Sequence, residues 1–359
     1  MSATSEHLII RADATHAMGT GHLMRCLALA QGWRETHEGR VTFITLCKSL
    51  GLLRRVVEAG FEVKTLKASY PDDGDLDSTL ASLKAKSPDT WLVLDGYHFD
   101  SNYQRRIKEA GHLLLVIDDL NHLGHYYADI VVNQNIYARS LEYSCEPYTQ
   151  LLLGTEYALL RQEFTSQARV QHAIAPVARK ILVTLGGSDP CNQTMKALRA
   201  LLALDMPDLE AKVVVGSTNP RLDEIREVAE SAGSSITVSV ITDAPDMAAL
   251  MAWADVAVTA AGSTCWELAF MGLPALLIVL ADNQTGIAEG LEEAGTAVSL
   301  GWHYELSEST IARELGLLLR DSSRRSDMSE KGQRIVDGQG SQRVSSTLSR
   351  LCVPVQVTS

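Results

Sequence analysis

The chain has 359 residues, a formal net charge of −12, and 46% hydrophobic and 21% charged residues. This length exceeds the usual size of one domain, so two globular domains are expected. The acidic balance argues against nucleic-acid binding as the main task, because such binding depends on basic patches. It does not exclude an anionic small ligand, since helix N-termini and a few local arginines can hold phosphate groups.

The sequence predicts a cytoplasmic protein without a membrane span. No run of residues approaches the roughly 18 apolar residues that a span requires, and residues 2–7 are polar, without a signal-peptide pattern. The six cysteines are scattered without a C-x-x-C pair, so we expect them to be reduced. His122 and His125 follow Asp118 and Asp119, but no third cluster of ligands supports a metal site, so none is predicted.

Strand-like and helix-like patterns alternate along the first half. Residues 67–77 are acidic and contain Pro71 and Gly74, which predicts a loop. The alternation is typical of a mostly parallel sheet covered by helices on both faces. The expected strands are 8–10, 41–46, 61–66, 91–94, 113–117 and 130–133, and the expected helices are 23–33, 50–59 and 80–86.

A second series of the same kind follows residues 151–154 and a helical pattern over 157–164. Residues 165–179 are polar and alanine-rich, which suits an interdomain linker. The whole pattern predicts two open α/β domains in tandem, with strand ends facing a shared cleft. Strands are expected at 180–185, 212–216, 236–240, 256–259, 275–280 and 297–300, and helices at 192–204, 247–253, 261–272, 311–319 and within 324–351.

His22 is the first candidate catalytic residue. Gly19 and Gly21 lie between the first strand and the helix that follows, so His22 opens a helix at the carboxyl end of a strand. Open α/β sheets bind ligands at this edge. An imidazole there can take a proton from water or a hydroxyl group. The alternative is a histidine that only caps or packs.

Three more polar residues are expected near this edge. Asp13 follows the first strand and could orient His22, hold substrate hydroxyls, or only cap the turn. Asp95 and Tyr97 end the strand that begins at Trp91. The Tyr97 phenol could position a hydroxyl or share a proton, or it could pack with its hydroxyl in water.

Glycine-bearing turns of the second half suit phosphate groups. Gly186-Gly187 and Gly262 each stand between a strand and a helix, where backbone N–H groups are free to bind phosphate oxygens. The hydroxyls of Ser188, Ser263 and Thr264 lie beside them, which favours a diphosphate. Neither turn, nor the one at Gly19 and Gly21, is a G-x-G-x-x-G fingerprint or a P-loop, so neither a nicotinamide cofactor nor ATP is indicated.

Two further positions could recognise the rest of a nucleotide sugar. Glu267 lies four residues after Ser263 and could bind a ribose diol, or could simply be a favourable charge at a helix N-terminus. Asp282-Asn283-Gln284 follows a strand and combines an acid with amides, which both donate and accept hydrogen bonds as sugar hydroxyls require. A plain polar turn is the alternative.

Taken together, the motifs resemble one family. The series resembles the UDP-2,4-diacetamido-2,4,6-trideoxy-β-L-altropyranose hydrolases of pseudaminic acid biosynthesis, a PseG/SpsG-like group related to the MurG glycosyltransferases. The resemblance covers about residues 8–300. The motifs that carry it are, in order, Arg11-Ala-Asp13, Gly19-Thr-Gly-His-Leu-Met-Arg25, Leu94-Asp-Gly-Tyr97, Ile117-Asp-Asp119, Asn133-Gln-Asn135, Tyr157-Ala-Leu-Leu-Arg161 with Glu163-Phe164, Leu185-Gly-Gly-Ser-Asp189, Ala261-Gly-Ser-Thr-Cys-Trp-Glu267 and Asp282-Asn-Gln284.

The resemblance implies a GT-B fold of two Rossmann-like domains, 1–165 with the catalytic histidine and 166–335 with UDP, followed by a helical tail at 336–359. It implies that water activated by His22 hydrolyses a UDP-sugar at the anomeric carbon with inversion, without metal or cofactor. The site residues expected on this basis and from the strand ends are His22 for catalysis, Asp13, Gly21, Tyr97, Asn283 and Gln284 for the sugar, and Gly186, Gly187, Ser188, Gly262, Ser263, Thr264 and Glu267 for UDP.

Two other functions fit the same motifs. An inverting glycosyltransferase would use the same base to deprotonate an acceptor hydroxyl instead of water. A non-catalytic nucleotide-sugar binding module would bind UDP and be indifferent to the loss of His22.

Overall fold

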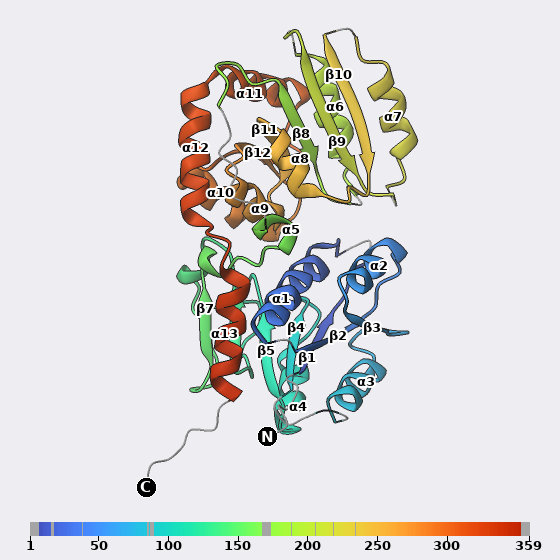
Figure 1. The fold of residues 1–359 in the computed structure, drawn as a ribbon, viewed down its shortest axis with the longest axis vertical. Helices are drawn as coiled ribbons and strands as arrows, with labels where there is room; N and C mark the ends of the chain where they lie inside the picture. The colour runs from blue at the N-terminus through green and yellow to red at the C-terminus, as the bar shows by residue number, and fades with distance from the viewer. Residues whose placement is uncertain are drawn as a thin grey trace. The chain divides into compact units, whose positions relative to one another are not determined.

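The chain forms two compact units, each built around its own parallel sheet (Figure 1). The first unit comprises Met1–Gln162 and Gly338–Ser359, and the second comprises Glu163–Asp337. A computed structural model describes residues 7–15, 18–37, 39–84, 86, 90–166, 174–187, 189–204, 206–217, 219–233 and 235–352.

The first unit contains a sheet of seven parallel strands in the order β3-β2-β1-β4-β5-β6-β7. The order reverses between β1 and β4, and open α/β sheets bind ligands at the carboxyl ends of strands at such a point. The strands are β1 His7–Ala12, β2 Arg40–Thr45, β3 Glu62–Thr65, β4 Trp91–Asp95, β5 Leu113–Ile117, β6 Ile130–Asn133 and β7 Gln150–Leu153. The helices are α1 Gly21–His37, α2 Leu50–Glu58, α3 Asp73–Lys84, α4 Ser101–Glu109 and α13 Gly340–Cys352, with short 3-10 turns η1 Ala138–Ser140 and η2 Thr155–Tyr157.

Both faces of this sheet are buried. Leu8 and Ile10 of β1 pack in one apolar core with residues of α1 and α13, whereas Ile9 packs in a second core with residues of α4. Successive side chains of a strand point to opposite faces, so an uninterrupted apolar run such as Leu8-Ile-Ile is the sequence signature of a strand covered on both sides.

Helix α13 packs on α1 although some 300 residues separate them in the sequence (Figure 1). The two backbones approach closely at Gly32, where an added methyl group would lie 2.6 Å from Ser341 Cβ. Gly340 lies equally close to the backbone of Ala158. Helix α13 therefore packs closely on α1, whose first turn contains His22, the predicted catalytic histidine.

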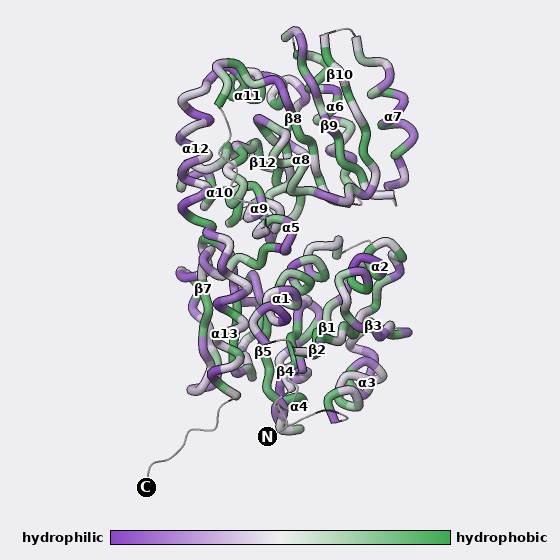
Figure 2. Tube along the Cα trace, viewed as in Figure 1, coloured by the Kyte–Doolittle hydropathy of each residue, from purple (hydrophilic) through white to green (hydrophobic). Residues whose placement is uncertain are grey.

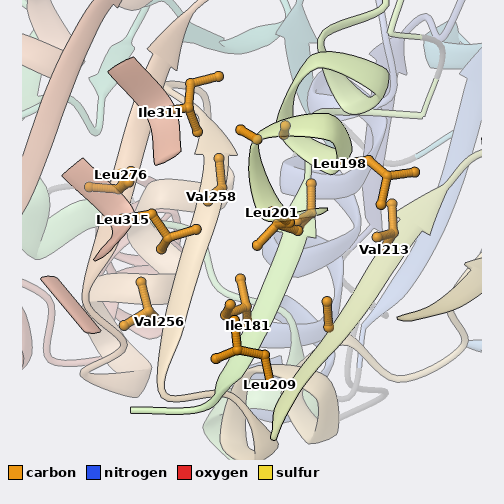
Figure 3. Packing of buried hydrophobic residues seen from close by; sticks show 14 of the residues in the cluster. Ile181, Leu198, Leu201, Leu209, Val213, Val256, Val258, Leu276, Ile311 and Leu315 are labelled. Atoms are coloured by element: carbon orange, nitrogen blue, oxygen red, sulfur yellow. The ribbon is translucent and has the colours of Figure 1, made fainter. Parts of the chain in front are cut away.

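The second unit contains six parallel strands in the order β10-β9-β8-β11-β12-β13. Its apolar core lies between the sheet and helices α6 and α11 (Figure 3). The strands are β8 Lys180–Thr184, β9 Leu209–Val215, β10 Ile236–Thr242, β11 Val256–Ala260, β12 Ala275–Val279 and β13 Ala297–Trp302. The helices are α5 Gln162–Thr165, which begins at the unit boundary, α6 Gln193–Leu202, α7 Leu222–Glu230, α8 Met247–Trp253, α9 Thr264–Met271, α10 Thr285–Glu293, α11 Glu308–Arg320 and α12 Ser322–Ile335, with the 3-10 turn η3 Asp282–Gln284.

Hydropathy follows this layering. Figure 2 shows hydrophobic residues along the strands and hydrophilic residues along much of α7 and α12. Helix α12 buries little besides Arg325, Met328 and Gly332. Gly332 allows close packing on α9, because an added methyl group would lie 3.1 Å from the Ala269 carbonyl oxygen. No helix in the described ranges is long and apolar enough to cross a membrane.

The strands agree with the sequence expectations more closely than the helices do. The predicted loop over 67–77 is wrong in its second half, because α3 begins at Asp73. The helix predicted over 157–164 is also wrong: η2 ends at Tyr157 and α5 begins at Gln162. Between them, the backbone N–H of Leu159 donates to Gln134 Oε1 at 2.9 Å, so a side chain replaces the helical acceptor.

Candidate functional site

His22 lies in the first turn of α1, beside the carboxyl end of β4. Its side chain is buried, and its Nδ1 lies 2.6 Å from Asp95 Oδ1. A carboxylate only accepts hydrogen bonds, so Nδ1 carries a proton, and in the neutral imidazole the lone pair is then on Nε2. Arg25 Nη2 also lies 3.2 Å from Nδ1, but a guanidinium only donates and cannot bond to a protonated nitrogen. The pair therefore presents Nε2 as a proton acceptor.

Asp95 is held in its ionised form. It is the last residue of β4 and is fully buried. Burial raises the pKa of Asp95, but the charge of Arg25 and the hydrogen bonds from Arg25 and His22 lower it more, so the net pKa lies below its ordinary value. Arg25 donates from Nε to Oδ2 and from Nη2 to Oδ1, both at 2.7 Å. His22 and Arg25 are three residues apart on α1, so they lie on one face of the helix.

Arg25 also binds a second carboxylate, that of Asp119, which follows β5. Its Nη1 donates to the two oxygens of Asp119 at 2.8 and 2.7 Å. Burial raises the pKa of Asp119, but the charge of Arg25 and the hydrogen bond from Tyr97 outweigh this effect. The net pKa of Asp119 therefore lies below its ordinary value. The Tyr97 hydroxyl donates to Asp119 Oδ2 at 2.6 Å, and Asn135 Nδ2 donates to Oδ1 at 2.9 Å.

We call His22, Arg25, Asp95, Tyr97 and Asp119 the His22 cluster. Within it, the Tyr97 ring meets the His22 ring edge-on, with centroids 4.9 Å apart. The structure thus brings together His22, Asp95 and Tyr97, as the strand ends predicted. Sequence reasoning assigned no role to Arg25 or Asp119, although both stand in the quoted motifs. The sequence signal that could have identified Asp119 is its position just after β5, the strand next to β4.

Asp13 does not contact His22, so the interpretation in which it orients the imidazole is wrong. Instead, its carboxylate accepts from Arg11 Nη2 at 2.8 Å, from Ser69 Oγ at 2.7 Å and from the Leu46 N–H at 2.6 Å. Arg11 is fully buried and also donates from Nε to Asp75 at 3.0 Å. Asp13 therefore joins the ends of β1 and β2 to the segment before α3.

A second histidine lies near Tyr97. His122 Nδ1 bonds to Asp118 Oδ1 at 2.8 Å, whereas His125 contacts Ser144 and Glu146 at 2.9 and 3.2 Å. Hydrogen bonding to Asp118 raises the pKa of His122, and burial opposes this only in part. In the part of the chain that the structure describes, no group of three or more His, Cys, Asp or Glu residues could hold a metal ion.

The candidate phosphate loops of the second unit follow strands β8 and β11, which are neighbours in the sheet. Gly186 has a φ of +89°, a conformation that favours glycine. Asp189 Oδ1 and Oδ2 accept from the N–H groups of Gln193 and Thr194 at 2.9 and 2.7 Å. Two N–H groups at the start of α6 are therefore already used by the chain itself. Ser188 lies outside the described residues.

The turn at Gly262 leads directly into α9. Ser263 is the N-cap residue, and its side chain makes no capping hydrogen bond. Thr264 begins the helix, and Glu267 lies in its first turn. A methyl group added at Gly262 would have only Gln284 Nε2 within 4 Å, at 3.9 Å. The space beside the Gly262 Cα is thus open, although the Gly262 N–H already donates to the Ala260 carbonyl oxygen at 2.8 Å.

Gln284 approaches the Gly262 turn from the next strand, β12, which pairs with β11. Its Oε1 accepts from the Leu280 N–H at 2.9 Å, which fixes the amide so that Nε2 remains the donor end. Asn283 stands in the same 3-10 turn, η3. The predicted positions at Gly262, Ser263, Thr264 and Gln284 therefore gather at one edge of the second sheet.

Comparison with known proteins finds similarity to a glycosyltransferase domain and to two proteins that match most of the chain. Residues 180–342 match the glycosyltransferase family 28 C-terminal domain. The chain is 29% identical to the spore coat polysaccharide biosynthesis protein SpsG of Bacillus subtilis, over 96% of this chain and 98% of that protein. It is 23% identical to the UDP-2,4-diacetamido-2,4,6-trideoxy-β-L-altropyranose hydrolase of Campylobacter jejuni, over 81% and 98% of the two chains.

Other similarities cover the chain less evenly or only in fold. An uncharacterised protein of Methanocaldococcus jannaschii is 29% identical over 77% of this chain, which spans 56% of that relative's length. The crystal structure of MurG from Acinetobacter baumannii has a TM-score of 0.69 at 16% identity and covers 96% of this chain and 99% of its own. These likenesses, with the two parallel sheets, show the two-domain GT-B fold.

Proposed function

The chain is a GT-B homologue of SpsG and of the altropyranose hydrolase, and from this relationship we propose that it hydrolyses a UDP-activated diacetamido-trideoxy sugar. The products are UDP and the free sugar, which would serve pseudaminic acid biosynthesis. The observation that carries the proposal is the His22–Asp95 pair, because its 2.6 Å bond from Nδ1 leaves Nε2 as a base.

The proposed reaction is a single displacement. A water oxygen attacks the anomeric carbon as His22 Nε2 takes its proton, and the bond from that carbon to the diphosphate oxygen breaks. The electron pair leaves with UDP, and attack opposite the leaving group inverts the anomeric centre. The imidazolium that forms is stabilised by the ionised Asp95 and then returns its proton to solvent.

Tyr97 and the polar residues of the second unit are assigned to substrate binding. The Tyr97 hydroxyl is held by Asp119 beside the His22 ring, which supports a role in positioning the sugar or the water. The open Gly262 turn, with the Ser263 hydroxyl and the N-terminus of α9, supports the binding of a diphosphate. Gly186, Gly187 and Ser188 are proposed to complete it, with Glu267 at the ribose and Asn283 and Gln284 at the sugar.

Asp13 and Gly21 are the remaining residues of the proposed site. Asp13 accepts several internal hydrogen bonds, so we assign it to holding the ends of β1 and β2 against the segment before α3. Gly21 begins α1 immediately before His22. Its small size leaves the backbone accessible at the point where the substrate must approach the base.

An inverting glycosyltransferase is the second candidate, favoured by the match of residues 180–342 to a glycosyltransferase domain. In that case His22 would deprotonate an acceptor hydroxyl instead of water. Incubation of the protein with the UDP-sugar alone separates the two. Release of UDP without acceptor supports the hydrolase, and strict dependence on an acceptor rules it out.

Carrying out this incubation in ¹⁸O-labelled water tests the cleaved bond as well. Mass spectrometry is expected to find the label in the free sugar and not in UDP, since the water oxygen becomes bonded to the anomeric carbon. Label in UDP would mean attack at phosphorus and would overturn the displacement mechanism. A panel of UDP-diacetamido sugars that differ in stereochemistry identifies the preferred substrate.

A further inference from the structure

The buried residues around His22 hold an excess of negative charge. The carboxylates of Asp95, Asp118 and Asp119 are 0%, 1% and 7% exposed. Among the described residues, the arginine or lysine that pairs with them is Arg25, which binds Asp95 and Asp119 but not Asp118. Buried carboxylates are costly unless cations or several hydrogen bonds compensate them. With Arg25 shared by Asp95 and Asp119, Asp118 is left without an arginine or lysine partner among the described residues.

Asp118 has a definite set of partners. Its Oδ2 accepts from the Asn121 N–H at 2.6 Å and from the Tyr143 hydroxyl at 3.0 Å, and both donors are neutral. Its Oδ1 bonds to His122 Nδ1 at 2.8 Å. His122 is therefore the partner of Asp118 that can carry a positive charge.

His122 is linked to the His22 cluster through Tyr97. The rings of His122 and Tyr97 meet edge-on with centroids 5.8 Å apart, and the rings of Tyr97 and His22 do so at 4.9 Å. The imidazole of His122 also interacts with the backbone of Tyr97, an acceptor that favours the doubly protonated ring. The Tyr97 ring thus contacts two imidazoles, those of His22 and His122, and each imidazole is bound to its own carboxylate.

We propose that His122, whose side chain is 27% exposed, carries a second positive charge beside these buried carboxylates, and that it thereby leaves His22 free of a proton to act as the base. His122 is a positioning residue in this scheme, because it acts on the charge of His22 and on the placement of Tyr97 without touching the reacting water. The inference rests on the proposed function only for the role of His22. The charge assignment itself concerns the free protein.

The groups that face His122 do not offer another source of this charge. Burial raises the pKa of Tyr126 and of Tyr143, so both phenols stay neutral at neutral pH. The pKa of Asp119 is lowered, so this carboxylate stays ionised. Among the described residues, the ionisable groups shown to interact with His122 are Asp118, Asp119, Tyr97 and Tyr126. Tyr143 and Arg25 bind the carboxylates of Asp118 and Asp119 in turn.

Nitrogen NMR of the full-length protein with ¹⁵N-labelled histidine tests the assignment without any substrate. The variants H122Q and H22A identify the two rings by the signals that disappear. At pH 7 both nitrogens of His122 are expected to give imidazolium shifts. In H122Q, the pH at which His22 takes up its proton is expected to rise by about 0.5 to 1 unit, since a nearby cation is lost in a medium of effective dielectric constant about 20.

Two further variants keep the test decisive. D118N retains His122 but removes its ionic partner, so the protonation midpoint of His122 is expected to fall, a result available even if H122Q does not fold. H125Q removes a histidine that pairs with Glu146 in the same region and is expected to leave His22 unchanged. A neutral His122 in the wild type at pH 7, or an unchanged His22 titration in folded H122Q, overturns the inference.

Kinetics then separates the inference from the function on which it draws. If the protein hydrolyses the UDP-sugar, the acid limb of kcat/KM in H122Q is expected to move to higher pH by the same shift that NMR records. If no hydrolysis is seen but the NMR result holds, the proposed function fails and the charge assignment stands. If hydrolysis is seen but the acid limb does not move, His122 does not govern the base and the inference fails.

Discussion

His22 Nδ1 lies 2.6 Å from Asp95 Oδ1, although 73 residues separate the two in the sequence. The strands β1 and β4 are neighbours at the point where the strand order reverses, so the helix that follows β1 starts beside the last residue of β4. Arg25, one turn further along α1, binds the same carboxylate and also binds Asp119, which follows β5. Three strand ends therefore share one hydrogen-bonded network.

The first prediction concerns the tautomer of His22. In D95N, the side-chain amide can donate a hydrogen bond to Nδ1, which favours the form with the proton on Nε2 and removes the base. We expect kcat to fall by about 10²- to 10⁴-fold, as for removal of a general base. H22A is expected to lose a similar amount, as measured by UDP release from the UDP-sugar.

The control for this prediction is nucleotide binding. Calorimetric titration with UDP is expected to give wild-type affinity for H22A, because the base acts on the reacting water and not on the nucleotide. A D95N enzyme with wild-type kcat contradicts the assigned tautomer. Normal turnover in H22A would mean that His22 is not the base, whereas UDP binding without any turnover in the wild type would leave only a binding function.

The second prediction concerns Arg25 and stability. Replacement by methionine leaves Asp95 and Asp119 buried without their cation, and breaking a buried pair in this way costs about 3–5 kcal/mol. Hydrogen exchange of amides in α1 and β4 measures the free energy of opening of the first unit by itself. R25K keeps the charge but cannot bind both carboxylates with a planar fork, so we expect an intermediate loss. Wild-type protection in R25M would show that the network contributes little to stability.

The same carboxylates give a pH dependence with a definite sign. The pKa values of Asp95 and Asp119 are lowered in the folded protein, so the unfolded chain binds protons first as the pH falls. Their contribution is complete above about pH 4, the ordinary carboxyl value, and is lost as the pH falls through the folded values. Hydrogen exchange at decreasing pH is expected to show a steeper loss of stability below pH 4 in the wild type than in R25M.

Much of the fold follows from apolar runs. Short runs such as Leu8-Ile-Ile and Trp91-Leu-Val-Leu favour strands buried on both faces, and Gly96 marks the end of the second run. Helix starts were harder to predict. The acidic segment around Asp75 predicts a loop, yet Asp75 lies in α3 and is buried, with its carboxylate bound to Arg11 of β1. A charged residue with a distant partner carries no local sign of burial.

The site was predictable in its location but not in its pairings. Parallel strand ends meet at one edge, so His22, Asp95 and Tyr97 could be grouped from the sequence. Whether Asp13 or Asp95 faces the imidazole depends on how each strand end is turned, and Arg11 takes Asp13 instead. Arg25 and Asp119 are 94 residues apart in the sequence, with strands β2 to β5 between them, so no periodicity in the sequence reveals their bond.

The third prediction tests the proposed diphosphate turn. A methyl group at Gly262 meets only Gln284 Nε2 at 3.9 Å, so G262A is expected to fold normally. If phosphate oxygens approach this backbone, the methyl group occupies their space, and UDP affinity is expected to fall by about tenfold or more. G233A is the matched control, since Gly233 also has open space around it and precedes β10. Equal UDP affinity in both variants would remove Gly262 from the site.

The fourth prediction concerns the seam between α1 and α13. A methyl group at Gly32 would lie 2.6 Å from Ser341 Cβ and 3.1 Å from its carbonyl carbon, so the two helices must move apart. Overpacking of this kind costs about 1–3 kcal/mol. We expect G32A to lower the opening free energy of amides in α1 and α13 by that amount, while amides of the second unit are unchanged.

G51A is the control for G32A, because it adds a methyl group at a helical glycine that has open space around it. Gly51 lies in α2, and the nearest atom to an added methyl group is Ser49 Oγ at 3.9 Å. Alanine is the better helix former by about 0.5–1 kcal/mol, so G51A is expected to stabilise α2 slightly. Because the proposed base His22 lies in the first turn of α1, separation of the helices in G32A is also expected to lower turnover, whereas G51A leaves it unchanged. Normal stability and turnover in G32A would mean that α13 does not support the position of His22.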